Sequence, residues 1–149
     1  MNASQDLILD VTQTIEIHAA IGDAYKALLK RMTTESSTPD NQPMPLVLEE
    51  WPGGRWFRDL GNGQGHLWGL VQVIKPPTII EIQGPMFMSY PAAGHIQFRL
   101  TQISGGVELY MRHRVLGLIE ADHRMRVEPG WESFISDVKK LSEPEENDA

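Results

Sequence analysis

The C-terminal segment 120–141 constrains the fold more than any other part of the chain. Its apolar residues recur at intervals of three and four, which places them on one face of an α-helix. They are Val127, Trp131, Phe134, Ile135, Val138 and Leu141. The opposite face carries charged side chains, including Glu132, Asp137 and Lys140. Because one apolar helix face needs a large apolar surface to cover it, we expect the rest of the chain to supply a sheet.

The chain before this helix is predicted to form mostly short β-strands. Apolar and polar residues alternate over 7–17, with Ile8 as the one exception, which indicates a long half-buried strand. Over 19–32 the apolar residues change to a helical spacing. Six further strands are expected between turn residues, over 46–51, 55–60, 66–75, 78–83, 95–103 and 107–116. Consecutive strands joined by tight turns form an antiparallel meander, and the last helix must lie across it.

Several connections carry specific predictions. Segment 61–65 is glycine-rich and is expected to be a flexible hairpin loop. Pro129 is expected either to kink the last helix or to begin its main part. Segment 84–94 is unusually apolar for a loop, so we expect it to be a lid that covers something. We expect one domain over 1–142 and a disordered acidic tail over 143–149.

Composition excludes several classes of function. The formal net charge of −7 disfavours nucleic-acid binding, because nothing neutralises the phosphate backbone. The absence of cysteine excludes disulfides, thiolate catalysis and thiolate zinc sites. No apolar run approaches the roughly 20 residues of a membrane span, and the N-terminus lacks the pattern of a secretory signal, so a cytoplasmic location is expected. There is no phosphate-loop or dinucleotide-binding pattern, and no cofactor is expected.

Five short motifs, in the same order along the chain, resemble one known family. They are Ile15-Glu16-Ile17 followed by a helix through Tyr25, Gly53-Gly54-Arg55, the strand 69–73 with Pro76-Pro77, the strand 106–113, and Gly130-Trp131. This order resembles the START-like superfamily, also called SRPBCC or helix-grip. Within it, the chain resembles the family of activators of the ninety-kilodalton heat-shock protein's ATPase. Val107, where threonine is usual, and Pro129, inside the last helix, depart from the pattern of that family.

The resemblance implies an α+β helix-grip fold. In this superfamily a curved sheet of about seven antiparallel strands wraps around a long C-terminal helix, and a cavity lies between sheet and helix. The resemblance does not imply one activity, because related families bind lipids, plant hormones or polyketides, and some catalyse cyclisation.

His113 is the first candidate site residue. Period-two alternation places it on the same face as Leu109 and Met111, toward the helix. There it is a candidate ligand anchor, acid or base. The alternative is a structural histidine that only bonds to a neighbour. His123 and Glu120 lie one and two helical turns before Val127 and could join it in a metal-binding or proton-transfer cluster, but their spacing matches no known metal motif, so no metal site is predicted.

Aromatic and methionine side chains are candidates for the wall of an apolar pocket. They are Trp56, Trp68, Met86, Phe87, Met88, Tyr90, Met111, Trp131 and Phe134. The alternative for these residues is ordinary core and lid packing.

Three functions are compatible with these observations. The first is binding of a small hydrophobic or amphipathic molecule by a monomer or homodimer, with His113 as the polar anchor. The second is a cofactor-free enzyme, such as a cyclase, dehydratase or hydrolase, with His113 as acid or base. The third is a protein-interaction module resembling the heat-shock ATPase activators, which would have a large exposed apolar or charged face.

Overall fold

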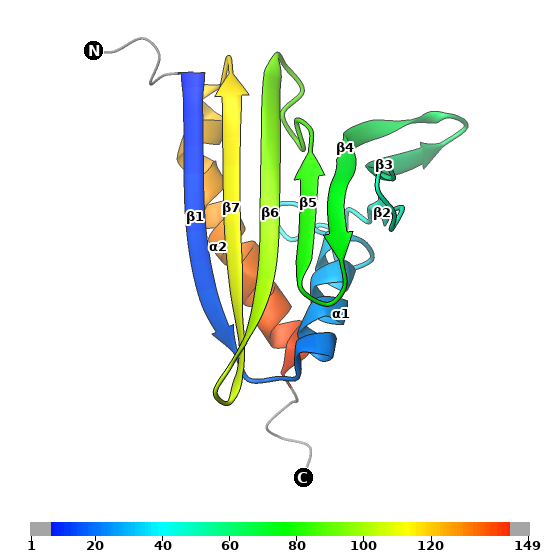
Figure 1. Ribbon diagram of the computed structural model, residues 1–149. Helices are drawn as coiled ribbons and strands as arrows, with labels where there is room; N and C mark the ends of the chain where they lie inside the picture. Colours follow the sequence, from blue (N-terminus) through cyan, green and yellow to red (C-terminus); the bar gives the residue numbers. More distant parts are fainter. Residues whose placement is uncertain (1–6, 144–149) are drawn as a thin grey trace.

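The computed structural model describes residues 7–143, which form seven strands and two helices (Figure 1). The strands are β1 (Ile8–Ile17), β2 (Val47–Leu48), β3 (Arg55–Gly61), β4 (Gln64–Lys75), β5 (Ile79–Gln83), β6 (Ala92–Ile103) and β7 (Gly106–Gly117). The helices are α1 (Ile21–Met32) and α2 (Ala121–Ser142). The strands form one antiparallel sheet in the order β1-β7-β6-β5-β4-β3-β2. This curved sheet with a long C-terminal helix confirms the predicted α+β architecture.

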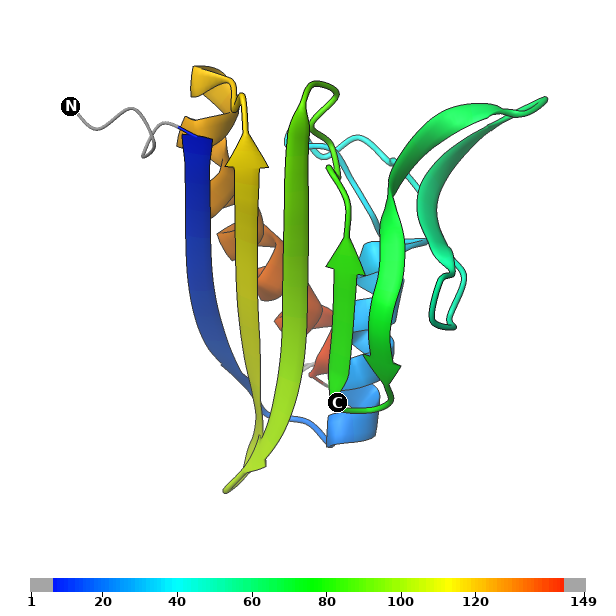
Figure 2. The same ribbon diagram turned by 45° about the horizontal axis from the view of Figure 1, so that its top comes forward.

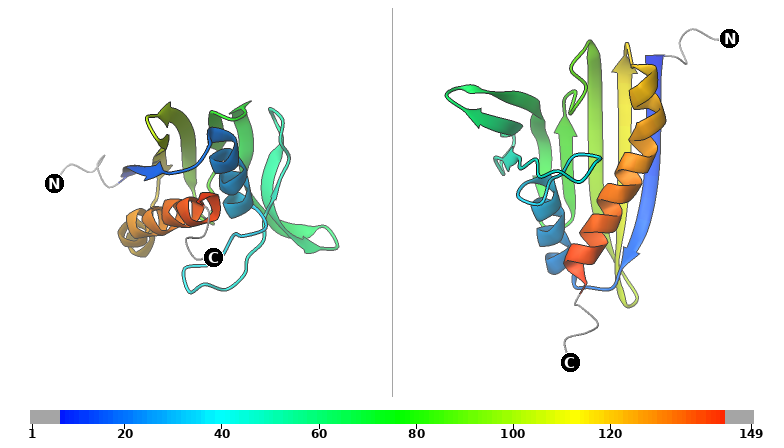
Figure 3. Two further views of the ribbon diagram at one scale, coloured as in Figure 1. Left: turned by 90° about the horizontal axis from the view of Figure 1, so that it is seen from below. Right: turned by 180° about the vertical axis from the view of Figure 1, so that it is seen from behind.

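Both helices lie on the same face of the sheet, and α2 crosses it from the N-terminal end of β1 toward α1 (Figure 3). Within residues 7–143 no helix covers the other face (Figure 2). The side chains of β7 follow the expected alternation, because Leu109, Met111 and His113 are all fully buried. The core therefore lies between one face of the sheet and the two helices.

Side chains at both ends of α2 attach the helix to the edge strand β1. Near its N-terminus, Arg124 Nη1 donates to the carbonyl oxygen of Ile8 at 2.8 Å. Near its C-terminus, Lys139 Nζ donates to the carbonyl oxygen of Glu16, also at 2.8 Å. These bonds attach both ends of the helix to the same strand. They also occupy backbone acceptors that an edge strand would otherwise offer to another chain.

The helix α2 differs from its prediction at two residues. Pro129 lies inside the helix and does not begin it, since α2 starts eight residues earlier at Ala121. Leu141 is 41% exposed, whereas the helical spacing predicted it to be buried. It lines a surface depression with Arg31 and Glu35, because the last turn of α2 lies beside the end of α1.

Several strands begin or end at other residues than predicted, because some turns are shorter than expected and one strand ends earlier. Asn62 and Gly63 both have positive φ, as in a two-residue hairpin turn, so β3 and β4 extend into the predicted loop 61–65. The predicted strand 46–51 shortens to β2, because a turn begins at Glu49. The backbone N–H of Glu49 donates to the carbonyl oxygen of Arg55, and the backbone N–H of Arg55 donates to the carboxylate of Glu49. β6 begins at Ala92, which shortens the irregular segment to 84–91.

The predicted tail 143–149 falls outside the described residues except for Glu143, whose carboxylate accepts a hydrogen bond from the backbone N–H of His18 at 2.8 Å. Neither helix within residues 7–143 is both long and apolar enough to cross a bilayer.

Candidate functional site

An inner cluster of four rings occupies the space between the sheet and α2. Phe98 comes from β6, His113 from β7, and Trp131 and Phe134 from α2. Phe98 and Phe134 stack with ring centres 5.5 Å apart, and the Trp131 ring meets Phe134 edge-on at 5.2 Å. The ring of His113 meets Trp131 edge-on at 5.3 Å. One polar ring thus lies inside an aromatic cluster.

The two nitrogens of His113 have different surroundings. Trp131 Nε1 donates a hydrogen bond to Nδ1 at 2.9 Å. Nε2 is buried and has no hydrogen-bond partner within residues 7–143. Burial, followed by the charge of His95, lowers the pKa of His113 to about 4, so the ring is neutral at pH 7. His113 therefore combines one satisfied nitrogen with one unsatisfied nitrogen.

Glycine backbone packs closely beside the unsatisfied nitrogen. A Cβ on Gly94 would lie 3.6 Å from His113 Nε2 and only 2.6 Å from the carbonyl oxygen of Gly84. A Cβ on Gly84 would lie 2.4 Å from the Cα atom of Gly69. Because no side chain separates these three segments, their backbones close off Nε2.

A second cluster, the mouth cluster, lies where segment 84–91 meets the N-terminal end of α2. Tyr90 Oη and His123 Nδ1 are hydrogen-bonded at 2.7 Å, and their rings stack at 5.5 Å. The ring of Phe87 meets two other rings edge-on, with its centre 5.4 Å from that of His123 and 6.1 Å from that of Trp68. The ring of Trp56 in turn meets that of Trp68, with centres 5.1 Å apart. The burial of Tyr90 raises the pKa of its hydroxyl.

Segment 84–91 covers this end of the core. Met86 and Met88 are fully buried beneath it. The backbone N–H of Met86 donates to the carbonyl oxygen of Trp68 at 2.8 Å, and that of Gly84 donates to the carbonyl oxygen of Gly94 at 2.9 Å. Backbone hydrogen bonds at Gly84 and Met86 hold the segment to the sheet, and the side chain of Tyr90 holds it to α2. The segment therefore lies where a lid would lie.

The structure divides the predicted site residues between the two clusters. His113, Trp131 and Phe134 belong to the inner cluster, and Met111 is paired with Phe98 across β6 and β7. The remaining predicted residues form the mouth cluster: Trp56, Trp68, Phe87, Tyr90 and His123.

The cluster considered from His113, His123 and Glu120 is only partly formed. Glu120 Oε2 lies 4.0 Å from His123 Nδ1, whereas His113 bonds to Trp131. Within residues 7–143 no three His, Asp or Glu side chains are arranged to hold a metal ion.

Three residues near the site were missed by the sequence interpretation. Phe98, which belongs to the inner cluster, was not predicted as part of the pocket wall. Arg31 lies 4.7 Å over the Phe134 ring and bonds Asp137 at 3.0 Å, so Asp137 faces α1 and not open water as expected. Tyr25 has a buried hydroxyl without a partner among the described residues. Periodicity could have indicated all three, because strand alternation places Phe98 on the buried face of β6 and helical spacing places Tyr25 and Arg31 one turn on either side of Leu28.

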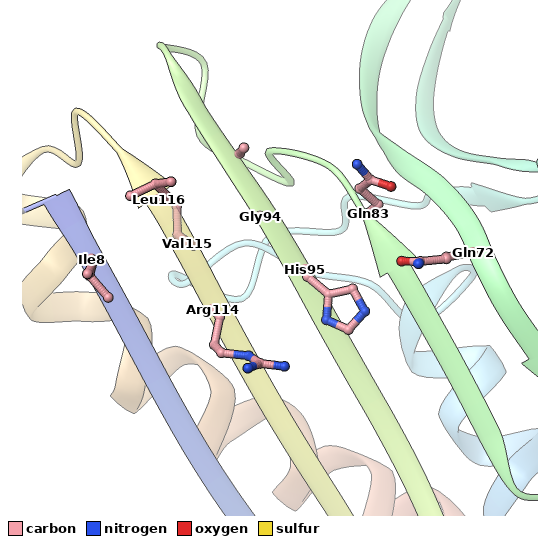
Figure 4. Close-up of a pocket in the computed structure, with 9 residues that line it drawn as sticks. Ile8, Gln72, Gln83, Gly94, His95, Arg114, Val115 and Leu116 are labelled. Atoms are coloured by element: carbon pink, nitrogen blue, oxygen red, sulfur yellow. The ribbon is translucent and has the colours of Figure 1, made fainter.

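Two surface depressions lie outside both clusters, although each is lined by a residue that contacts the inner cluster, Gly94 in one and Arg31 in the other. The larger, about 530 Å³, is on the helix-free face of the sheet, where His95, Arg114 and Gln83 project (Figure 4). The smaller, about 260 Å³, lies between the ends of α1 and α2. Neither contains a predicted site residue. Neither depression is the internal cavity predicted between the sheet and α2, so that cavity stays a prediction.

Comparison of the sequence with models of known protein families and with characterised proteins finds no match. Solved structures do match. The di-domain ARO/CYC StfQ from the steffimycin biosynthetic pathway is 18% identical, with a TM-score of 0.64 over 93% of this chain and 50% of that chain. The di-domain ARO/CYC BexL from the BE-7585A biosynthetic pathway is 17% identical, with a TM-score of 0.65 over 94% and 52%. A protein from Chromobacterium violaceum is 16% identical, with a TM-score of 0.71 over 91% and 98%.

The fold is the helix-grip fold. At these identities the similarity shows the fold alone. The chain spans about half of the length of the two ARO/CYC proteins. The narrower resemblance to the heat-shock ATPase activators stays a prediction, since no family model matches.

Proposed function

We propose that this protein binds a small apolar or amphipathic molecule between the sheet and α2, with His113 as the polar anchor. One observation carries the proposal: Nε2 of His113 is buried and has no hydrogen-bond partner among residues 7–143. Leaving such a group unpaired costs about 1–3 kcal/mol, and most buried polar groups are paired. A bound ligand that partners Nε2 removes this cost.

The surroundings of His113 fit the rest of such a ligand. Its ring meets the ring of Trp131 edge-on, and Met111 lies beside it on β7. Ligand pockets are lined mainly by apolar and aromatic groups with few polar ones, and methionine adapts to irregular shapes. A single polar anchor in an apolar wall selects an apolar molecule that carries one polar group.

Entry would take place at the mouth cluster. Segment 84–91 is joined to α2 by the Tyr90–His123 hydrogen bond and by the ring contact of Phe87 with His123. Breaking these few side-chain contacts would free segment 84–91 from α2, and the backbone hydrogen bonds of Gly84 and Met86 would still hold one end of the segment to the sheet. The biosynthetic-pathway proteins that share the fold support a small-molecule role by analogy.

Native mass spectrometry of freshly expressed protein, followed by a thermal-shift screen of apolar compounds, tests the proposal. We expect a co-purified small molecule, or a compound whose binding at 100 times its dissociation constant stabilises the fold by about 2.7 kcal/mol. A protein that carries no ligand and is stabilised by none of a broad panel of aromatic and aliphatic compounds would refute the proposal.

A second candidate is a cofactor-free enzyme of the cyclase or dehydratase type. The observation that favours it is the Tyr90–His123 pair, two groups able to transfer protons, with Glu120 within 4.0 Å of the imidazole. Incubation of the protein with a bound ligand should then change the mass of that ligand by loss of water. The His123→Asn variant should bind the ligand and leave its mass unchanged. A ligand recovered unaltered from the wild-type protein argues for binding alone.

A further inference from the structure

We infer that the ligand presents an acceptor oxygen, such as a ketone, quinone or enolate oxygen, to Nε2–H of His113, because Trp131 occupies Nδ1. This inference rests on the proposed function and specifies the chemistry of its anchor.

Trp131 determines the tautomer of His113. An indole Nε1–H can only donate, so the nitrogen that receives it must hold a lone pair. That nitrogen is Nδ1, at 2.9 Å. A neutral imidazole carries one proton, which must then be on Nε2. The unpartnered atom is therefore a hydrogen-bond donor that faces inward.

The charged form of His113 is incompatible with this arrangement. A second proton would be placed on Nδ1, directly opposite the indole N–H, and the Trp131 hydrogen bond would be lost. Burial also holds the pKa of His113 near 4, so the neutral ring is the form that meets a ligand at pH 7. Nε2 thus donates a hydrogen bond but is a poor source of a full proton.

Gly94 is the residue next to Nε2: a Cβ on it would lie 3.6 Å from Nε2 and 2.6 Å from the carbonyl oxygen of Gly84. A small acceptor atom can therefore reach Nε2 once Gly84 moves away from Gly94. An oxygen with free lone pairs would satisfy the donor. An apolar group would leave the donor unpaired, and an ammonium or amide N–H would place two donors against each other. His113 therefore discriminates among apolar ligands by the single ligand atom that faces Nε2.

Two measurements on the full chain test the inference. Long-range proton–nitrogen NMR correlations report which ring nitrogen of His113 carries the proton. Titration calorimetry with two probes of the same shape, 2-acetonaphthone and 2-isopropenylnaphthalene, compares a carbonyl oxygen with a methylene group at one position. We expect the proton on Nε2 and at least about fivefold tighter binding of the ketone, the effect of pairing one buried donor.

Variants of His113 test whether its imidazole ring causes the preference for the ketone. In His113→Asn the shorter amide can still accept from Trp131 but does not reach the position of Nε2, so the ketone preference should disappear. In His113→Gln an amide N–H can approach that position, so part of the preference should return. His18→Asn, a change at an exposed histidine, should keep the wild-type preference.

The possible outcomes distinguish failure of the acceptor inference from failure of the proposed binding function. Equal affinity of the wild-type protein for both probes overturns the acceptor inference and leaves the binding function standing. A proton on Nδ1 overturns the inference whether or not a probe binds. Failure of both probes to bind up to their solubility counts against the binding function and the inference together.

Discussion

The indole Nε1 of Trp131, on helix α2, donates a hydrogen bond to Nδ1 of His113, on strand β7, at 2.9 Å. This bond joins the long helix to the sheet, and the other imidazole nitrogen has no partner in the part of the chain that the structure describes. One contact thus contributes both to the stability of the core and to the chemistry of the site.

Replacing Trp131 by Phe should reduce the free energy of unfolding by about 1–3 kcal/mol, because Nδ1 of His113 loses its donor while it stays buried. Urea denaturation measures this change. Trp51→Phe is the matched control, since Trp51 is 56% exposed and should change stability by less than about 0.5 kcal/mol. Equal unfolding midpoints for Trp131→Phe and wild type would show that the bond contributes nothing.

Stability should fall in mild acid because of His113. Its pKa is about 4 in the folded protein and 6.5 in its ordinary state, so the unfolded chain binds the proton more tightly. The neutral ring therefore makes its full contribution to stability above pH 6.5. As the pH falls toward 4 this contribution is lost, and the free energy of unfolding decreases by up to about 3 kcal/mol. Denaturation midpoints between pH 7 and pH 4 should show a smaller slope in His113→Asn than in wild type. His18→Asn should keep the wild-type slope; if His113→Asn keeps it too, another group causes the acid effect.

Tyr25→Phe should leave stability unchanged or raise it by up to about 1 kcal/mol, because the buried hydroxyl has no partner among the described residues. Burial, followed by the charge of Glu50, raises the pKa of this hydroxyl to about 12. Thermal and urea denaturation both measure the change. A loss above about 1 kcal/mol would reveal a hydrogen bond that this conformation lacks.

Tyr90→Phe should loosen segment 84–91 without unfolding the core. The variant loses the 2.7 Å hydrogen bond to His123 and keeps the ring stacking. Amide hydrogen exchange within 84–91 should become about two- to tenfold faster, while exchange in β6 and β7 stays unchanged. Ser89→Ala, at an exposed position of the same segment, is the control. Wild-type exchange rates in Tyr90→Phe would mean that this bond does not hold the segment closed.

Local patterns predicted much of this architecture correctly. Alternation along β7 placed His113 on the inner face, and the helical spacing of α2 identified the buried positions Trp131 and Phe134. Each of these predictions depends on the geometry of one element, in which the direction of a side chain follows from the count of residues. Predictions failed where a turn or another element decided the outcome. Leu141 is exposed because the last turn of α2 lies beside the end of α1, and the loop predicted at 61–65 shortens because Asn62 and Gly63 adopt a two-residue turn.

The sequence by itself determined the order of strands and helices, the antiparallel meander, and the side of the sheet that His113 faces. Tertiary structure decided which groups meet. The His113–Trp131 bond joins residues 18 apart on different elements, and the Tyr90–His123 bond joins residues 33 apart. Such pairs depend on the curvature of the sheet and on where α2 crosses it, and both follow from packing of the whole core. For that reason the buried histidine was visible in the sequence, whereas the nitrogen it offers to a ligand was not.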